Sequence, residues 1–159
     1  MAPKRKGRTP RAENTAANLP PRRPVAQQGL VDEYKHLHPV FSFALTDWNY
    51  QGEWGWNLLD GGDALRLVQF MYEIGKKTWN EVFQDLNYGR KKHHGHPFAR
   101  LCPAAQERLS VLGHDDEDTL FRFRDGRTKR LWGFHASGDG VFYVLWWDPN
   151  HQVFPTEPE

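Results

Sequence analysis

Apolar residues alternate with small or polar residues in two early runs of the chain, 41–45 and 54–58. A period of two is typical of strands with one buried face. The intervening residues 49–52, with the sequence Asn-Tyr-Gln-Gly, have turn chemistry. We therefore expect these two runs to form a β-hairpin.

Between residues 60 and 75 the apolar spacing lengthens, which predicts a helix. Asp60 can cap its first amides, and Gly75 is expected to end it in the left-handed conformation. The side chains expected to face inward are Leu65, Val68, Met71 and Tyr72.

Two further helices are expected before residue 114. Thr78 and Glu81 have the spacing of a capping box, and Val82, Phe83 and Leu86 should then face inward. The last helix should begin at Pro103 and stop at Gly113. Its inward side chains should be Ala105, Leu109 and Leu112.

From residue 119 the period returns to two. Phe121 and Phe123 alternate with arginines, Asp125-Gly126 is a tight-turn pair, and residues 130–135 form the returning strand. Residues 141–147 are apolar without a break, as in a strand buried on both faces, and 152–154 may add an edge strand. This order predicts an α+β fold, in which two or three helices pack on one face of a twisted antiparallel sheet.

The charge is distributed unevenly along the chain. Residues 1–24 carry +6, whereas the other 135 residues carry −5. Residues 1–30 have little to bury, so we expect a disordered basic tail, which serves either as a solubilising extension or as a phosphate-binding arm. Residues 31–155 should form one domain, and 156–159 a disordered end.

Several classes of protein find no support in the sequence. It has no apolar run of 18 residues and no leader pattern, so no membrane association is expected. The single Cys102 cannot form an internal disulfide, which favours a cytoplasmic location. Glycine-rich phosphate loops, dinucleotide fingerprints and nucleophile elbows are absent too.

The first candidate functional cluster is the segment 90–96, which contains Lys91, Lys92 and His94 and is expected to be a loop. Its cations can neutralise phosphates, and its imidazoles can exchange protons near neutral pH. A solvated loop is the alternative. Its three histidines are too close together to complete a zinc site without a second thiol, so neither a metal nor a cofactor is expected.

The second cluster lies on the predicted hairpin 119–135. Arg122 and Arg124 share the strand face opposite the phenylalanines, where guanidinium groups can clamp a phosphate. Further cations in the hairpin are Arg127, Lys129 and Arg130. The alternative is an ordinary solvent face neutralised by the acidic run 115–118.

The third cluster spans residues 146–151, where a strand ends in a turn. Trp147 could stack on a base, and His151 could act as acid or base. The alternative places both tryptophans in the core and leaves His151 to cap the turn.

The order of helices, basic histidine-rich segment, arginine-bearing hairpin and Trp-Asp-Pro-Asn-His turn resembles RelE/HigB-type toxins of toxin–antitoxin modules. The residues that carry the resemblance lie within about 60–155, in the segments 91–94, 120–124 and 144–151. It implies a RelE-like fold and a metal-independent endoribonuclease that cuts messenger RNA, with RNA or the ribosome and a cognate antitoxin as partners.

The resemblance also implies roles for particular residues. His151, Arg124 and His94 would be catalytic. Lys91, Lys92, Arg122, Arg130 and Trp147 would bind RNA. Two other functions stay open: a non-catalytic module of phage or mobile-element type that binds a host protein through an aromatic sheet surface, and a domain tethered to nucleic acid by its basic tail. The nuclease hypothesis requires His94, Arg124 and His151 to converge on one surface.

Overall fold

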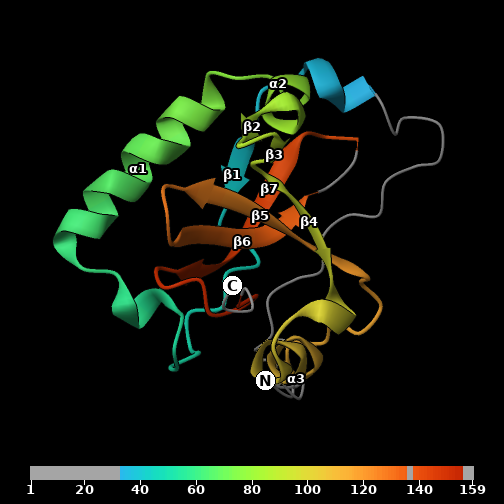
Figure 1. The fold of residues 1–159 in the computed structure, drawn as a ribbon. Helices are drawn as coiled ribbons and strands as arrows, with labels where there is room; N and C mark the ends of the chain where they lie inside the picture. Colours follow the sequence, from blue (N-terminus) through green and yellow to red (C-terminus); the bar gives the residue numbers. More distant parts are fainter. Residues whose placement is uncertain (1–32, 136–137, 156–159) are drawn as a thin grey trace, which may run out of the picture.

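A five-stranded mixed sheet forms the centre of the fold (Figure 1), which a computed structural model describes for residues 33–135 and 138–155. The strands lie in the order β1-β7-β6-β5-β4. Their bounds are β1 Val40–Ser42, β4 His94–Pro97, β5 Thr119–Asp125, β6 Lys129–His135 and β7 Val141–Asp148. The expected disordered segments 1–30 and 156–159 lie outside the described residues.

The C-terminal strands β5, β6 and β7 form the predicted antiparallel meander. Gly126 has a φ of 74° in the β5–β6 turn, a conformation that favours glycine over other residues. The sheet is not wholly antiparallel as expected, because β1 pairs with β7 in parallel.

The N-terminal hairpin prediction is wrong. Only Val40–Ser42 form a strand in this region, and Trp56–Leu58 form a short 3-10 helix, η3, rather than a returning strand. The segment after β1 makes hydrogen bonds to β7 instead. The Asp47 amide and Trp56 Nε1 both donate to the carbonyl of Leu145, at 3.2 and 3.0 Å. Pairing with a strand far along the chain outweighs the local turn chemistry.

Helices cover both faces of the sheet rather than one (Figure 1). Adjacent residues of a strand point to opposite faces, and Leu120 and Phe121 belong to two different cores. The helix α3, Pro103–Val111, packs in the core of Leu120. The helices α1, Gly61–Gly75, and α2, Trp79–Gln84, pack in the core of Phe121. The coarse α+β class is confirmed, and the single helical layer is not.

Capping chemistry begins α1 and α2 as the sequence predicts. The left-handed conformation expected of Gly75 is wrong, because Gly75 is still helical and Lys76 ends α1 in the right-handed region. The Asp60 carboxylate accepts from the Asp63 amide at 2.7 Å, and Thr78 and Glu81 form the complete capping box. Gly113, with a φ of 81°, follows α3. The buried stripe of α1 differs from most of the prediction: Leu67 and Ile74 are buried, whereas Leu65, Val68 and Tyr72 are exposed. Of the residues expected to face inward, Met71 packs against the core.

Two short segments depart from the sequence prediction near the pocket described below. The segment 90–97 is not a loop: β2, Leu86–Asn87, and β3, Arg90–Lys91, form a small hairpin, and β4 joins the main sheet. The 3-10 helix η4, Phe98–Arg100, then leads toward α3, and a further one, η2, Glu33–His36, precedes β1. Residues 152–154 form no strand.

Candidate anion-binding pocket

A pocket of about 830 Å³ opens beside the strands β3 to β6 and the turn that follows β7. Cations dominate its lining, and no Asp or Glu contributes to it. The lining residues are Asn87, Tyr88, Arg90, Lys91, His94, Gly95, His96, Pro97, Arg100, Arg122, Arg124, Arg127, Arg130, His151 and Phe154. Such a lining is suited to an anion that carries more than one charge.

The pairing of β4 with β5 places His94 directly opposite Arg122. His94 Nδ1 lies 3.1 Å from the Gly95 carbonyl oxygen, and its Nε2 lies 3.4 Å from an amino group of Arg122. A neutral ring with its proton on Nδ1 satisfies both contacts. Burial, followed by the charges of Arg122 and Lys91, lowers the pKa of His94. The imidazole is therefore neutral at pH 7 and orients the guanidinium.

Arg122 and Arg130 are buried cations on the floor of this pocket. Burial is the main reason that the pKa of each falls to about 10, and neighbouring arginines lower it further. Their Nε atoms have no hydrogen-bond partner among the described residues. Three backbone carbonyls of the β5–β6 turn accept from Arg130, but no described carboxylate forms an ion pair with either side chain. An incoming anion would relieve this repulsion.

The carbonyl of Gly126 holds Arg124 and Arg130 together. It accepts from Arg124 Nε at 3.0 Å and from an amino group of Arg130 at 3.2 Å. The shared acceptor keeps the two guanidinium groups close together, and clustered guanidinium groups can bind a phosphate.

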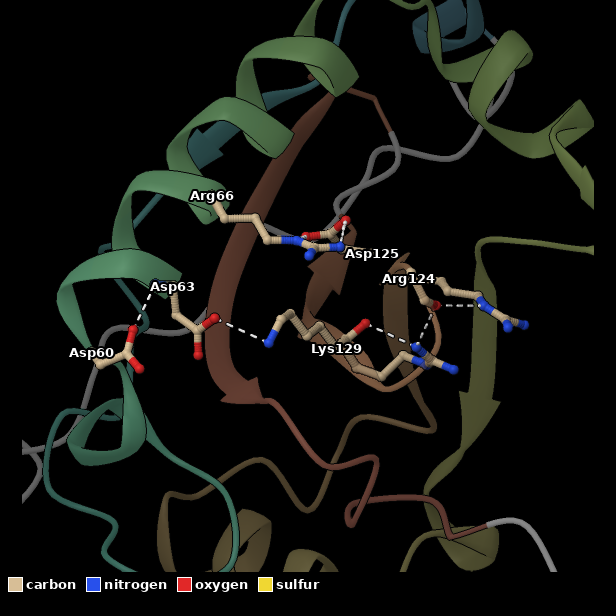
Figure 2. A network of polar contacts seen from close by, with 8 residues as sticks. Asp60, Asp63, Arg66, Arg124, Asp125 and Lys129 are labelled. Atoms are coloured by element: carbon tan, nitrogen blue, oxygen red, sulfur yellow. Dashed lines mark hydrogen bonds and ion pairs between the residues drawn. The ribbon is translucent and has the colours of Figure 1, made fainter.

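Two ion pairs tie the hairpin that carries these arginines to α1 (Figure 2). Arg66 contacts Asp125 at 3.1 Å, and Asp63 contacts Lys129 at 3.0 Å. Lys129 therefore points to α1 and is not among the residues lining the pocket. Asp125, the acid nearest in sequence to the pocket arginines, pairs with Arg66 instead. It therefore does not neutralise the charge of these arginines.

His151 enters the pocket from the turn after β7, where its φ of 57° is unusual for a residue other than glycine. The buried carboxylate of Asp148 accepts from the amides of Gln152 and Val153, at 2.9 and 3.0 Å, and from Trp132 Nε1 at 3.2 Å. These bonds fix the turn. Burial and then Arg130, Arg122 and Arg124 lower the pKa of His151 to about 4.

The structure brings together six of the eight predicted site residues: Lys91, His94, Arg122, Arg124, Arg130 and His151. The side chain of Lys92 is not part of the lining; its backbone carbonyl accepts from Arg122 at 3.5 Å.

The stacking role expected of Trp147 is wrong, because that side chain is fully buried. Trp132 pairs with Trp146 and Gly133 with Val144, so Leu145 forms a bulge in β7. The bulge puts Leu145 and Trp146 in the same core and turns Trp147 into the other one, away from the face of Arg122. A Cβ on Gly133 would overlap the Tyr143 carbonyl, which explains the glycine opposite the bulge.

Sequence reasoning missed several lining residues. Asn87 and Tyr88 belong to the β2–β3 hairpin, whose Tyr-Gly pair was not interpreted as a turn. Arg100 ends η4, which follows β4, and Phe154 follows the turn after β7. Both line the pocket, and the Arg100 guanidinium lies 6.0 Å from the centre of the Phe154 ring. The residues of these separate segments come together only in the folded chain, where they line the same pocket as the arginines.

Residues 33–135 and 138–155 contain no group of three His, Cys, Asp or Glu side chains arranged to hold a metal ion. The helices within those ranges are too short or too polar to cross a bilayer. No family model, curated protein sequence or solved structure matches the chain. The functional argument therefore depends on the pocket itself.

Proposed function

We propose that this pocket binds RNA and cleaves it without a metal ion, so that the protein is a toxin-like endoribonuclease. One observation carries the proposal: His94, Arg124 and His151, which are far apart in the sequence, line one pocket with six further Lys or Arg side chains and no carboxylate. The resemblance to RelE/HigB-type toxins is consistent with this function.

Arg122, Arg124 and Arg130 would hold the phosphodiester. Their shared face in β5 and β6 and the bonds to Gly126 direct several guanidinium groups toward one place. Fixed cations stabilise the charge that gathers on phosphate oxygens in the transition state. Arg122 and Arg130 are already buried, and carbonyls of the β5–β6 turn hold Arg124 and Arg130, so little reorganisation is needed when RNA binds.

The cleavage uses the ribose 2′-hydroxyl as nucleophile. Its oxygen bonds to phosphorus, the bond from phosphorus to the 5′-oxygen breaks, and a 2′,3′-cyclic phosphate and a 5′-hydroxyl remain. His151 accepts the proton of the 2′-hydroxyl, because it lines the pocket and is neutral at pH 7. Bound phosphate raises the pKa of His94, which then donates a proton to the leaving oxygen.

The test is cleavage of a 5′-labelled single-stranded RNA in the presence of EDTA, with mapping of the product ends. We expect cyclic phosphate ends, and a loss of about 10²- to 10⁴-fold in rate for His151→Ala. Arg124→Ala should be similarly impaired, and expression of the wild-type chain should arrest growth. The control is Lys76→Ala, whose side chain pairs with Glu73 on α1 outside the pocket. Intact RNA, or cleavage by His151→Ala at the wild-type rate, would refute the proposal.

A protein partner is the second candidate function. The aromatic side chains of the sheet, which were expected to bind the partner, are buried in the two cores. The helix α1 instead exposes a row of apolar side chains, Leu65, Val68 and Tyr72, whose exposed fractions are 62, 59 and 65 %. Apolar and aromatic groups in such a row are common in protein interfaces. Growth arrest that survives His151→Ala and Arg124→Ala but disappears in Leu65→Glu/Val68→Glu would favour this candidate.

A further inference from the structure

The β2–β3 hairpin turns through Tyr88 and Gly89, whose φ angles are 51° and 76°. A two-residue turn with positive φ at both positions favours Asn-Gly, and a bulky aromatic residue in the first position is strained. Strain of this kind persists where surrounding contacts or function require it. Its presence in Tyr88 therefore calls for a reason.

Packing does not supply that reason. Tyr88 is 97 % exposed, and no aromatic ring of the described chain contacts it, although it belongs to the lining of the pocket. The other aromatic residue of the lining, Phe154, is packed against His96, with ring centres 4.3 Å apart. Tyr88 is thus the aromatic residue of the pocket whose faces are free.

The neighbours of Tyr88 carry charge that complements a nucleic-acid backbone. Arg90 and Lys91 follow it in the same hairpin and line the same pocket. Another pocket residue, Arg124, lies 2.8 Å from the side-chain oxygen of Asn87, which precedes Tyr88, when the Asn87 amide is turned so that its oxygen faces the guanidinium. A free aromatic ring beside a row of cations is the combination that binds single strands, because each unpaired base offers a face for stacking.

We propose that Tyr88 stacks on an unpaired base next to the phosphate held by the arginines, so that the pocket selects single-stranded over duplex RNA. This inference rests on the proposed RNA binding. In a duplex the bases stack on one another and expose only their edges, so Tyr88 would gain nothing from it. The hairpin's strained turn holds the ring in water in the free protein, ready for a base.

The test measures affinity for a short single-stranded RNA that carries a 2′-O-methyl group on every ribose and so cannot be cut. Tyr88→Asn should weaken its binding by about 5- to 150-fold, the range expected for one stacked base. Tyr88→Phe should keep the wild-type affinity. Asparagine suits the positive φ, so the Tyr88→Asn chain should melt at the wild-type temperature or above, which separates lost stacking from lost folding.

Two matched ligands complete the experiment. An abasic strand with the same number of phosphates should bind the wild-type and Tyr88→Asn chains equally, and the annealed duplex should bind more weakly than the single strand. Equal affinity of wild type and Tyr88→Asn for the single strand would overturn the inference, as would a duplex that binds as tightly. Failure of the nuclease proposal would give a different result: unmodified RNA would stay intact, although binding would still depend on Tyr88.

Discussion

His93 Nδ1 lies 3.0 Å from the backbone nitrogen of Arg124, which donates a hydrogen bond to it. This bond leaves the ring proton on Nε2, 3.6 Å from a carboxylate oxygen of Asp85. His93 is 1 % exposed. It therefore joins the segment before β4 to the backbone of a pocket arginine without entering the pocket.

We expect His93→Ala to lower the free energy of unfolding by about 2–4 kcal/mol, since it opens a cavity and removes the acceptor of a buried amide. Arg124 should also lose its fixed position, so RNA affinity should fall under conditions where the variant is folded. Urea unfolding and a binding titration measure the two effects. His36→Ala, at an exposed position, should change stability by less than about 0.5 kcal/mol. Unchanged stability of His93→Ala would show that this bond contributes nothing.

Arg124 should contribute to RNA binding mainly through charge. Arg124→Ala should weaken binding of every sequence alike and reduce the slope of log affinity against log salt concentration by about 1. Fluorescence anisotropy between 50 and 200 mM salt, conditions in which the slope is large, provides the measurement. Lys76→Ala should retain the full slope; an Arg124→Ala slope equal to that of wild type would place the phosphate elsewhere.

Asp148 is expected to act on catalysis through the position of His151. Asp148→Ala removes the acceptor of two turn amides and of Trp132 Nε1, and should cost about 2–4 kcal/mol of stability. Asp148→Asn keeps one acceptor oxygen and should fold better, yet still release part of the turn. Its rate constant should fall while its RNA affinity stays near that of wild type. A normal rate in Asp148→Asn would contradict this positioning role.

Stability should depend on pH through buried histidines, among them His93 and His96. Burial is the first cause that lowers the pKa of His93 and His96 to about 3 in the folded chain, whereas unfolded histidine has a pKa of about 6.5. Between these values the unfolded chain binds more protons, so stability is complete above about pH 6.5 and is lost as pH falls toward 3. The slope should approach about 1.4 kcal/mol per pH unit for each histidine. Urea midpoints between pH 4 and 8 measure it, and greater stability at pH 5 than at pH 7 would contradict it.

The ties between α1 and the β5–β6 hairpin should matter more for activity than for stability. Arg66 is about half exposed, so Arg66→Ala should cost less than about 1 kcal/mol. Combined loss of Arg66 and Asp63 would free the turn whose carbonyls hold Arg124 and Arg130, and the rate of RNA cleavage should fall several-fold. Glu73→Ala, which breaks an ion pair elsewhere on α1, is the matched control. Equal rates in the double variant and the control would mean that the turn keeps its shape unaided.

The parts of the fold that depend on neighbouring residues could be predicted from the sequence. The cap at Asp60, the capping box at Thr78 and the Asp125-Gly126 turn need only a few residues each. The buried face of α1 differs from the prediction because two apolar stripes of this helix satisfy helical spacing. The stripe that packs against the sheet is the one that contains Leu67 and Ile74. Local spacing cannot choose between them.

The sequence could suggest that His94, Arg124 and His151 meet on one surface, but it could not predict the geometry of the pocket that they line. The bulge at Leu145 reverses the face of Trp147, and its cause is a long-range pairing with β6 rather than a turn residue. Likewise, β4 becomes a strand because β5 offers it a partner. Tyr88 was overlooked because a single exposed tyrosine has no periodicity.

The parallel pairing of β1 with β7 has a consequence for how the protein is made. Val40 lies opposite Val141, so about a hundred residues separate the two partners, and contacts this distant form slowly. During synthesis the early segment must wait until nearly all of the sheet has been translated. His151 emerges later still, so a nascent chain carries the pocket arginines before it carries the proposed base. Any RNA cleavage that depends on His151 therefore cannot begin before residue 151 has been translated.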